Sequence, residues 1–315
     1  MQTDIATEVL VLFLIMAAGY YARRRKFIDA TTNRGITELI LNVTLPMMVV
    51  VSFTFDFNRE MLSTAMKLLM VSFGLHVALY FISGLFFRRH PQETRSVLRF
   101  MTIFSNSAFM GYPVLQSLYG KIGIFYASIF GVPFTIALWS LGVMLFTGEK
   151  GPQALKKALI NPGVLAVVAG LVIFIGSIKL PPPLLKACEL VGSTTTPLSM
   201  IVVGATLADT RLRDLFSGLA IYYGSAVRLL LVPLLVLAVL SLLGIKGMVL
   251  GICVVSMAMP AAANTAMFAE KYDGDTQLAS RCIFLSTALS LLTIPLVIAI
   301  LHAAMGEKTI NLHLW

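Results

Sequence analysis

The chain has 315 residues, of which 58% are hydrophobic and only 12% are charged, and its mean hydropathy is +0.88. Apolar windows of about 20 residues, each long enough to cross a hydrocarbon core of roughly 30 Å, recur almost from end to end. This pattern leaves no room for a sizeable soluble domain, and the net charge of +9 lies in short loops, where membrane topology explains it better than an acidic partner or nucleic acid.

The apolar pattern predicts ten membrane-spanning helices. Their expected ranges are 5–22, 35–55, 62–87, 97–119, 122–147, 162–180, 188–208, 214–242, 247–270 and 276–304. Basic residues gather in the loops after the odd-numbered spans, including Arg23, Arg24, Arg25, Lys26, Arg88, Arg89, Arg95, Lys150, Lys156, Lys157, Arg211, Arg213, Lys271 and Arg281. The positive-inside rule therefore predicts that both termini lie on the outer side of the membrane.

A polar linker at 148–161 divides the spans into a first half at 1–147 and a second half at 162–315. Five spans in each half make the halves run in opposite directions, which is the condition for an inverted repeat. Similar motifs occur at equivalent places: TLPMMVVVSFT in span two and TTPLSMIVVGA in span seven. The sequence thus predicts an all-α polytopic membrane protein built from two inverted five-helix repeats.

Spans four and nine are each interrupted by a proline and an asparagine. Span four contains Asn106 and Pro113, with Gly111 and Tyr112 between them, and span nine contains Pro260 and Asn264. A proline in a membrane helix frees a backbone carbonyl, which is tolerated where the backbone lines a cavity. Interrupted helices at matching positions of two halves indicate a transporter's substrate site, although a simple kink explains either span alone.

Arg228 lies deep within span eight, about 20 Å along the helix from Leu215. An arginine at such depth should face the protein interior, because snorkelling to the interface is costly. A shifted span boundary would instead place it at the membrane interface, and at depth two roles remain open for it. It could bind an anionic substrate through two hydrogen bonds, or it could face the negative ends of a broken helix and replace a bound cation.

The remaining chemistry-bearing residues suggest neither an enzyme nor a cofactor. Cys188, Cys253 and Cys282 lie in or beside apolar spans without metal-ligand spacing, and the four histidines do not cluster. No P-loop motif is present, so we expect no ATP hydrolysis by this chain. The acidic start MQTDIATEVL differs from a basic signal peptide, and we expect the first span to be retained.

The sequence resembles the auxin efflux carrier family, whose bacterial branch includes organic-acid permeases, over essentially its whole length. The resemblance rests on LNVTLPMMVVVSF, NSAFMGYP, RLLLVP and MPAAANTAMFAEKY. It implies a scaffold domain of helices 1, 2, 6 and 7, a transport domain of helices 3–5 and 8–10, and a homodimer through the scaffold. Plant members have a longer central loop and a second proline where this chain reads Asn264–Thr265.

The resemblance also implies that spans four and nine cross at their breaks to form the substrate site, as in bile acid symporters. The residues expected there are Asn106, Gly111, Tyr112, Pro113, Arg228, Pro260, Asn264 and Thr265, with support from Asn42, Pro46, Thr196 and Pro197 in helices two and seven. We therefore predict a secondary active transporter for a small organic anion in the bacterial cytoplasmic membrane. Its partners would be that anion, the lipid bilayer and a second copy, without nucleic acid.

Other functions remain as alternatives. A sodium-coupled symporter would require several convergent oxygens, including carboxylates, and the predicted spans contain almost no acidic residue. This scarcity favours proton coupling, potential-driven movement or no coupling. A channel or an intramembrane enzyme would require a continuous pore or a catalytic constellation, for which the sequence gives no sign, and a nontransporting membrane sensor would keep the binding site without flux.

Overall fold

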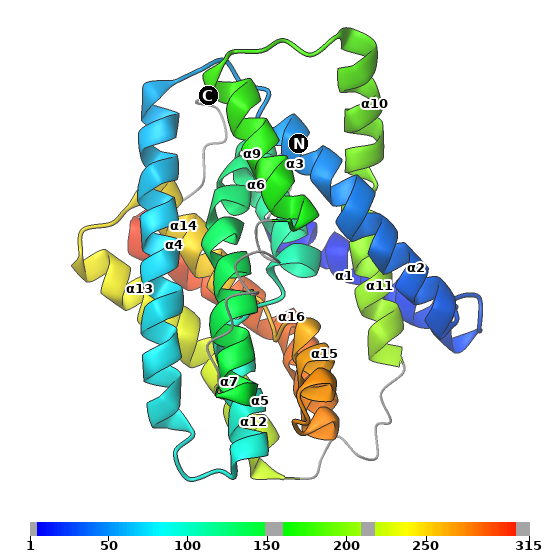
Figure 1. Cartoon of the computed structure of the whole chain (residues 1–315), viewed down its shortest axis with the longest axis vertical. Coiled ribbons are helices and arrows are strands. Elements are labelled where there is room, and N and C mark those ends of the chain that lie inside the picture. Colours follow the sequence, from blue (N-terminus) through cyan, green and yellow to red (C-terminus); the bar gives the residue numbers. More distant parts are fainter. Residues whose placement is uncertain (1–4, 149–159, 209–217, 307–315) are drawn as a thin grey trace. The chain divides into compact units, whose positions relative to one another are not determined.

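The computed structural model describes residues 5–148, 160–208 and 218–306 (Figure 1). The regular elements in these ranges are helices, and those labelled η are π-helical. In chain order they are α1 (Ile5–Arg24), α2 (Ala30–Leu39), η1 (Ile40–Thr44), α3 (Leu45–Ser52), α4 (Arg59–Phe86), α5 (Gln92–Ile103), η2 (Ser107–Gly111), α6 (Tyr112–Ala137), η3 (Leu138–Gly142), α7 (Val143–Thr147), α9 (Pro162–Ile175), α10 (Pro182–Ser193), α11 (Thr195–Ala208), α12 (Leu219–Ala226), η5 (Val227–Leu231), α13 (Val232–Leu242), α14 (Gly247–Ala258), α15 (Asn264–Lys271) and α16 (Thr276–Met305).

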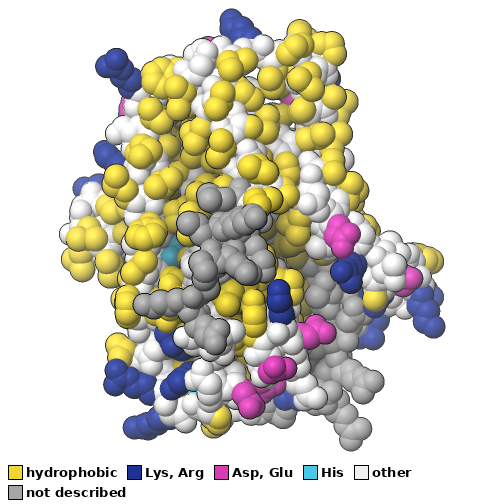
Figure 2. All heavy atoms as spheres, viewed as in Figure 1, with side chains coloured by type: hydrophobic (Ala, Val, Ile, Leu, Met, Phe, Trp, Pro, Cys, Tyr) yellow, Lys and Arg dark blue, Asp and Glu magenta, His cyan; other side chains and the backbone are white. Residues whose placement is uncertain are grey.

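The described helices are those of an integral membrane protein. Six helical stretches are long and apolar enough to cross a bilayer, namely Ala30–Ser52, Arg59–Phe86, Ser107–Thr147, Pro182–Ala208, Leu219–Leu242 and Thr276–Met305. Large apolar side chains lie on the surface, and hydrophobic side chains cover much of the face shown in Figure 2. Phe81, Leu242 and Leu292 expose 68%, 87% and 75% of their surface, as expected of lipid-facing positions. Most of the predicted linker, with Arg211 and Arg213, lies outside the described ranges.

The chain divides into two compact units. Unit 1 comprises Met1–Leu69, Ala108–Ile136 and Pro152–Asp209. Unit 2 comprises Met70–Ser107, Ala137–Gly151 and Thr210–Trp315. The first predicted broken span is therefore shared, since its first half belongs to unit 2 and its second half to unit 1.

Unit 1 is held together by close helix packing. Helix α1 lies against α11, where a Cβ added to Gly204 would come within 1.8 Å of the Met16 carbonyl oxygen. Helices α9 and α10 both pack on α3. The ring of Phe53 packs on Phe125, with 4.5 Å between their centroids, and Phe125 packs on Phe174 at 5.2 Å. Helix α6 is interrupted at Gly120, whose φ of 61° lies in the left-handed region that favours glycine.

Unit 2 has an aromatic core that joins the first half of one broken span to the second half of the other. The ring of Phe100 in α5 lies 4.8 Å from that of Phe268 in α15, and 4.7 Å from that of Phe104. A Cβ at Gly142 would lie only 3.0 Å from the Phe100 ring, so the glycine leaves room for these rings. Helices α5 and α15 are thus held against each other by buried aromatic side chains.

Three of the described π-helical turns each precede a proline. Pro46, Pro113 and Pro233 occupy the second position of α3, α6 and α13, directly after η1, η2 and η5. Proline has no N–H to donate to the carbonyl four residues earlier, and its ring crowds that carbonyl. The wider turn accommodates this: the N–H of Leu45 donates to Ile40, and that of Val232 donates to Val227, each five residues back.

Candidate functional site

Two helices of unit 2 end in the interior, and the extended segments that follow them pair with each other. Helix α5 ends at Ile103 and α14 ends at Ala258, and Ser105 then forms an isolated antiparallel bridge with Ala261. The N–H of Asn106 donates to the Pro260 carbonyl at 2.8 Å, and the N–H of Ala262 donates to the Phe104 carbonyl at 3.2 Å. We call this paired segment, residues 104–106 and 260–262, the crossing. It satisfies backbone groups that helix ends leave without partners.

The two prolines of the motif have different places in the backbone. Pro260 is in the crossing itself, and the residue before it, Met259, is extended (φ −66°, ψ 149°), as the proline ring requires. Pro113 is not in a break. It lies eight residues beyond Ser105 within the continuous helical stretch that begins at Ser107, where the π-helical turn η2 before it accommodates its missing N–H. In the first broken span, helix therefore ends at Ile103, well before its proline.

The two asparagines are at equivalent points beyond the crossing. Asn106 immediately precedes η2, and Asn264 is the first residue of α15. The side chain of Asn106 is buried and that of Asn264 is half-buried. Within the described part of the chain, the Asn264 amide makes no hydrogen bond. Both asparagines thus lie at the start of a second half-helix, although one precedes its proline in sequence and the other follows it.

The guanidinium of Arg228 is fully buried against the ends of both first half-helices. Its Nη1 donates to the Thr102 carbonyl at 2.7 Å, Nη2 to Met257 at 3.0 Å, and Nε to Met259 at 3.0 Å. Thr102 is in the last turn of α5, while Met257 and Met259 are at the end of α14. The carbonyl ends of helices carry negative partial charge. This geometry favours the second of the two roles left open by the sequence.

Several polar residues that the sequence did not single out support the crossing. The Ala261 N–H donates to Ser286 Oγ on α16 at 3.1 Å. The Ser105 and Ser107 hydroxyls are 2.6 Å apart and flank Asn106. The ring of His76 on α4 stacks over Phe104 with 6.4 Å between centroids, and its Nδ1 donates to the Ser72 carbonyl at 2.7 Å. For Ser105 and Ser107, the Ser-Asn-Ser run within an apolar span was the sequence pattern that could have indicated this role.

The other predicted site residue of unit 2, Thr265, turns its hydroxyl back to the chain. Its Oγ1 donates to the Ala262 carbonyl at 2.7 Å, and the side chain is fully buried. Unit 2 therefore brings together Asn106, Pro260, Thr265 and Arg228 around one crossing, with Asn264 at its edge.

The remaining predicted residues belong to unit 1. Gly111 and Pro113 are buried at the junction of η2 and α6, and Tyr112 between them is half-buried. The Thr196 hydroxyl donates to Gln116 Oε1 at 2.7 Å, and its neighbour Pro197 is exposed. Next to them, Thr195 and Thr44 hydrogen-bond through their hydroxyls at 2.9 Å. The threonines that begin the two similar Thr-X-Pro motifs thus contact each other.

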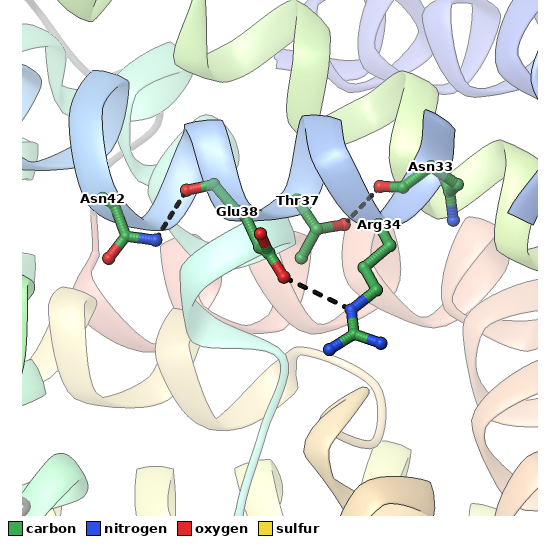
Figure 3. Close-up of polar contacts among 5 residues, drawn as sticks. All are labelled: Asn33, Arg34, Thr37, Glu38 and Asn42. Atoms are coloured by element: carbon green, nitrogen blue, oxygen red, sulfur yellow. Dashed lines mark hydrogen bonds and ion pairs between the residues drawn. The ribbon is translucent and has the colours of Figure 1, made fainter. Parts of the chain in front are cut away.

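Asn42 belongs to a row of polar side chains along α2 and η1 (Figure 3). Its Nδ2 donates to the Glu38 carbonyl at 2.8 Å. The Glu38 carboxylate in turn pairs with Arg34 at 3.3 Å, and both side chains are exposed. Asn42 is itself exposed, and Pro46, one turn further along, is half-buried. The amide of Asn42 therefore interacts with its own helix.

Comparison with known proteins agrees with a membrane transporter. A family model described as a membrane transport protein matches residues 4–155 and 150–298. An uncharacterized transporter of Methanothermobacter thermautotrophicus is 27% identical, with 94% of this chain and 97% of the relative aligned. The uncharacterized transporter YfdV of Escherichia coli is 26% identical over 94% and 97% of the two chains. The chain belongs to this membrane transport protein family, which is the auxin efflux carrier family.

Proposed function

We propose that this protein is a secondary active transporter that moves a small organic anion of the carboxylate type across the cytoplasmic membrane by alternating access. The observation that carries the proposal is the crossing, in which two interrupted helices expose half-helix ends inside an apolar unit. Substrate sites of secondary transporters are formed at such discontinuous helices. Membership of a transporter family supports transport as the general activity.

The charges around the crossing support an anion as the substrate. The negative carbonyl ends of α5 and α14 are already neutralised by Arg228. The half-helices that begin at Ser107 and Asn264 start directly beside the crossing, so their positive N-terminal ends lie next to it, and such ends favour anions. Among the side chains that the structure describes, no aspartate or glutamate is buried. We assign Asn106 and Asn264 as donors to the substrate, because neutral amides can orient a carboxylate without adding charge.

We further propose that ten spans form two inverted five-helix repeats, at 1–147 and 162–315. The interruption at Gly120 supports this count, because it separates Ser107–Thr147 into two stretches. The Thr44–Thr195 hydrogen bond supports it as well, because equivalent residues of inverted repeats meet near their symmetry axis. Unit 1 contains predicted spans 1, 2, 6 and 7, the proposed scaffold, but it also contains parts of spans three, four and five, so its boundary differs from that of the proposed domains. Spans 3–5 and 8–10 would form the transport domain.

The assembly and orientation belong to the same proposal. We propose a homodimer through the scaffold helices in the bacterial cytoplasmic membrane, with both termini on the outer side. Basic residues after α1 and after α4 support this orientation, since positive loops remain in the cytoplasm.

Uptake by the purified protein in sealed liposomes would test this function. Labelled mono- and dicarboxylates would be offered outside, with a proton gradient, a membrane potential or neither imposed across the bilayer. Saturable uptake of at least one carboxylate, absent from empty liposomes, is expected. Uptake restricted to cations or neutral solutes would contradict the anion assignment.

Two alternatives predict other outcomes in the same liposomes. A sodium-coupled symporter of an amphipathic anion would require a sodium gradient for uptake. A nontransporting sensor would bind a carboxylate without flux, so that a ligand would raise the unfolding temperature while the vesicle interior stayed unlabelled.

A further inference from the structure

We propose that Arg228 is a built-in cation which occupies the position that a bound metal ion would otherwise take between the two broken helices. It allows the crossing to keep its structure without sodium. The inference deepens the proposed function, because transport without sodium coupling follows from it only if the protein is a transporter. The position of Arg228 at the crossing depends on unit 2 alone.

The ligands around the guanidinium are those of a small hard cation. The three acceptors are main-chain carbonyl oxygens, from Thr102, Met257 and Met259, at 2.7–3.0 Å from the guanidinium nitrogens. Carbonyl oxygens are typical ligands of alkali and alkaline-earth ions, and unwound helix ends hold Na⁺ in secondary transporters. In this protein the three carbonyl oxygens accept hydrogen bonds from the N–H groups of one side chain, that of Arg228.

The charge of Arg228 is balanced by backbone dipoles. All its hydrogen bonds to described residues go to main-chain carbonyls, and no aspartate or glutamate among the described side chains is buried with it. The ends of two helices, each with negative partial charge, converge on the guanidinium. A planar guanidinium reaches three diverging carbonyls, which a compact ammonium does less well.

The local backbone fixes Arg228 in this position. Arg228 lies in the π-helical turn η5, ahead of Pro233, and its neighbours Val227 and Leu229 are buried. The π-turn shifts the register of the helix by one residue relative to a regular α-helix. Arg228 thus lies in a helical distortion next to Pro233 and reaches the crossing from there.

Removal of the side chain should convert the three carbonyls into a site for a free cation. Purified wild type and Arg228→Ala would be unfolded thermally in choline chloride, and then with sodium, potassium or guanidinium chloride at millimolar concentration and equal ionic strength. We expect Arg228→Ala to unfold on the order of 5–10 °C lower in choline chloride. Guanidinium or sodium should recover part of that loss, whereas the wild type should show no cation-specific change.

Arg99→Ala is the matched control. Arg99 is also an arginine of unit 2 that donates to a main-chain carbonyl, from Nη2 to Tyr80 at 2.7 Å, but it is only half-buried, and its guanidinium binds residues of α4 and not the carbonyl end of a broken helix. Its variant should gain nothing specific from any cation. The proposal is overturned if sodium stabilises the wild type specifically, or if no cation restores stability to Arg228→Ala beyond the change in Arg99→Ala.

A second pair of variants keeps the test decisive if the alanine variant does not fold. Arg228→Lys and Arg228→Gln have similar length and differ in charge. The lysine variant should unfold at a higher temperature in choline chloride, and only the glutamine variant should gain stability from sodium. Equal stability of the two without a sodium effect would contradict a role for the charge. Because stability is measured without substrate, failure of uptake by the wild type would count against the proposed function alone.

Discussion

The buried hydroxyl of Ser286 accepts a hydrogen bond from a backbone N–H that has no helical acceptor because the second broken span is interrupted there. Its Oγ accepts the Ala261 N–H at 3.1 Å inside the crossing. Ser286→Ala would leave this buried N–H without an acceptor, which costs about 1–3 kcal/mol. We therefore expect the variant to lose that much unfolding free energy, measured by thermal or denaturant unfolding in detergent.

Ser290→Ala separates this effect from the loss of any buried hydroxyl. Ser290 lies one turn further along α16, is equally buried, and donates only to the Thr287 carbonyl of its own helix. Its removal leaves no buried N–H alone, so the loss should be under about 1 kcal/mol. Equal losses in the two variants would show that Ser286 has no special role at the crossing.

For single residues, burial was predictable from the sequence, whereas hydrogen-bond partners were not. The depth of Arg228 in an apolar span predicted that it would face the interior. Its partners were not predictable, because they are three backbone carbonyls from residues 29 to 126 positions away, and carbonyls leave no signal in side-chain type. The same holds for Ser286, whose partner is a main-chain N–H.

At the level of elements, the contact of α1 with α11 depends on glycine. A Cβ on Gly204 would lie 1.8 Å from the Met16 carbonyl oxygen, and one on Gly19 would lie 2.2 Å from that of Ile201. Small residues let membrane helices approach this closely. Gly204→Ala must separate two backbones, and we expect it to lower the unfolding free energy by about 1–3 kcal/mol or more, measured by thermal unfolding.

Gly74→Ala is the control for the substitution itself. Gly74 is within α4, and a Cβ there would meet nothing within 4 Å. Alanine should be neutral or stabilise this helix by up to about 1 kcal/mol, since glycine is entropically unfavourable in helices. If Gly204→Ala is as stable as Gly74→Ala, the close approach of α1 and α11 does not matter for stability.

The helical ranges and the interrupted spans were predictable from the sequence, whereas the location of one break was not. Apolar periodicity and span length indicate where helices lie, and proline indicates a disturbance. In the second broken span the disturbance is the break, at Pro260. In the first, Pro113 lies within a continuous helical stretch and is accommodated by the π-turn before it, while the chain already leaves the helix at Phe104. The break there is stabilised by pairing with distant residues, which local sequence does not encode.

At the scale of the whole molecule, the ten-span proposal makes a prediction about sidedness. Lys26 follows α1 and should lie inside, while Lys246 precedes α14 and should lie outside. Single cysteines at these positions, with Cys188, Cys253 and Cys282 replaced by serine, would be exposed to a membrane-impermeant maleimide. Lys246→Cys should react in intact cells, and Lys26→Cys only after permeabilisation.

The opposite labelling pattern would reverse the proposed orientation. Labelling of both positions from the same side would be more damaging, because it would require an even number of spans between them. That result would exclude the ten-span arrangement and with it the inverted repeat.

The central claim is that the crossing holds the transported anion through Asn106 and Asn264, and uptake by the Asn106→Ala, Asn264→Ala double variant tests it most directly. Each lost hydrogen bond to a charged ligand is worth about 1.5–3 kcal/mol, so uptake at low substrate concentration should fall at least about tenfold. Asn58→Ser, at the start of α4, keeps an oxygen for its Glu60 N–H and should transport normally. Full uptake by a correctly folded double variant would contradict the account.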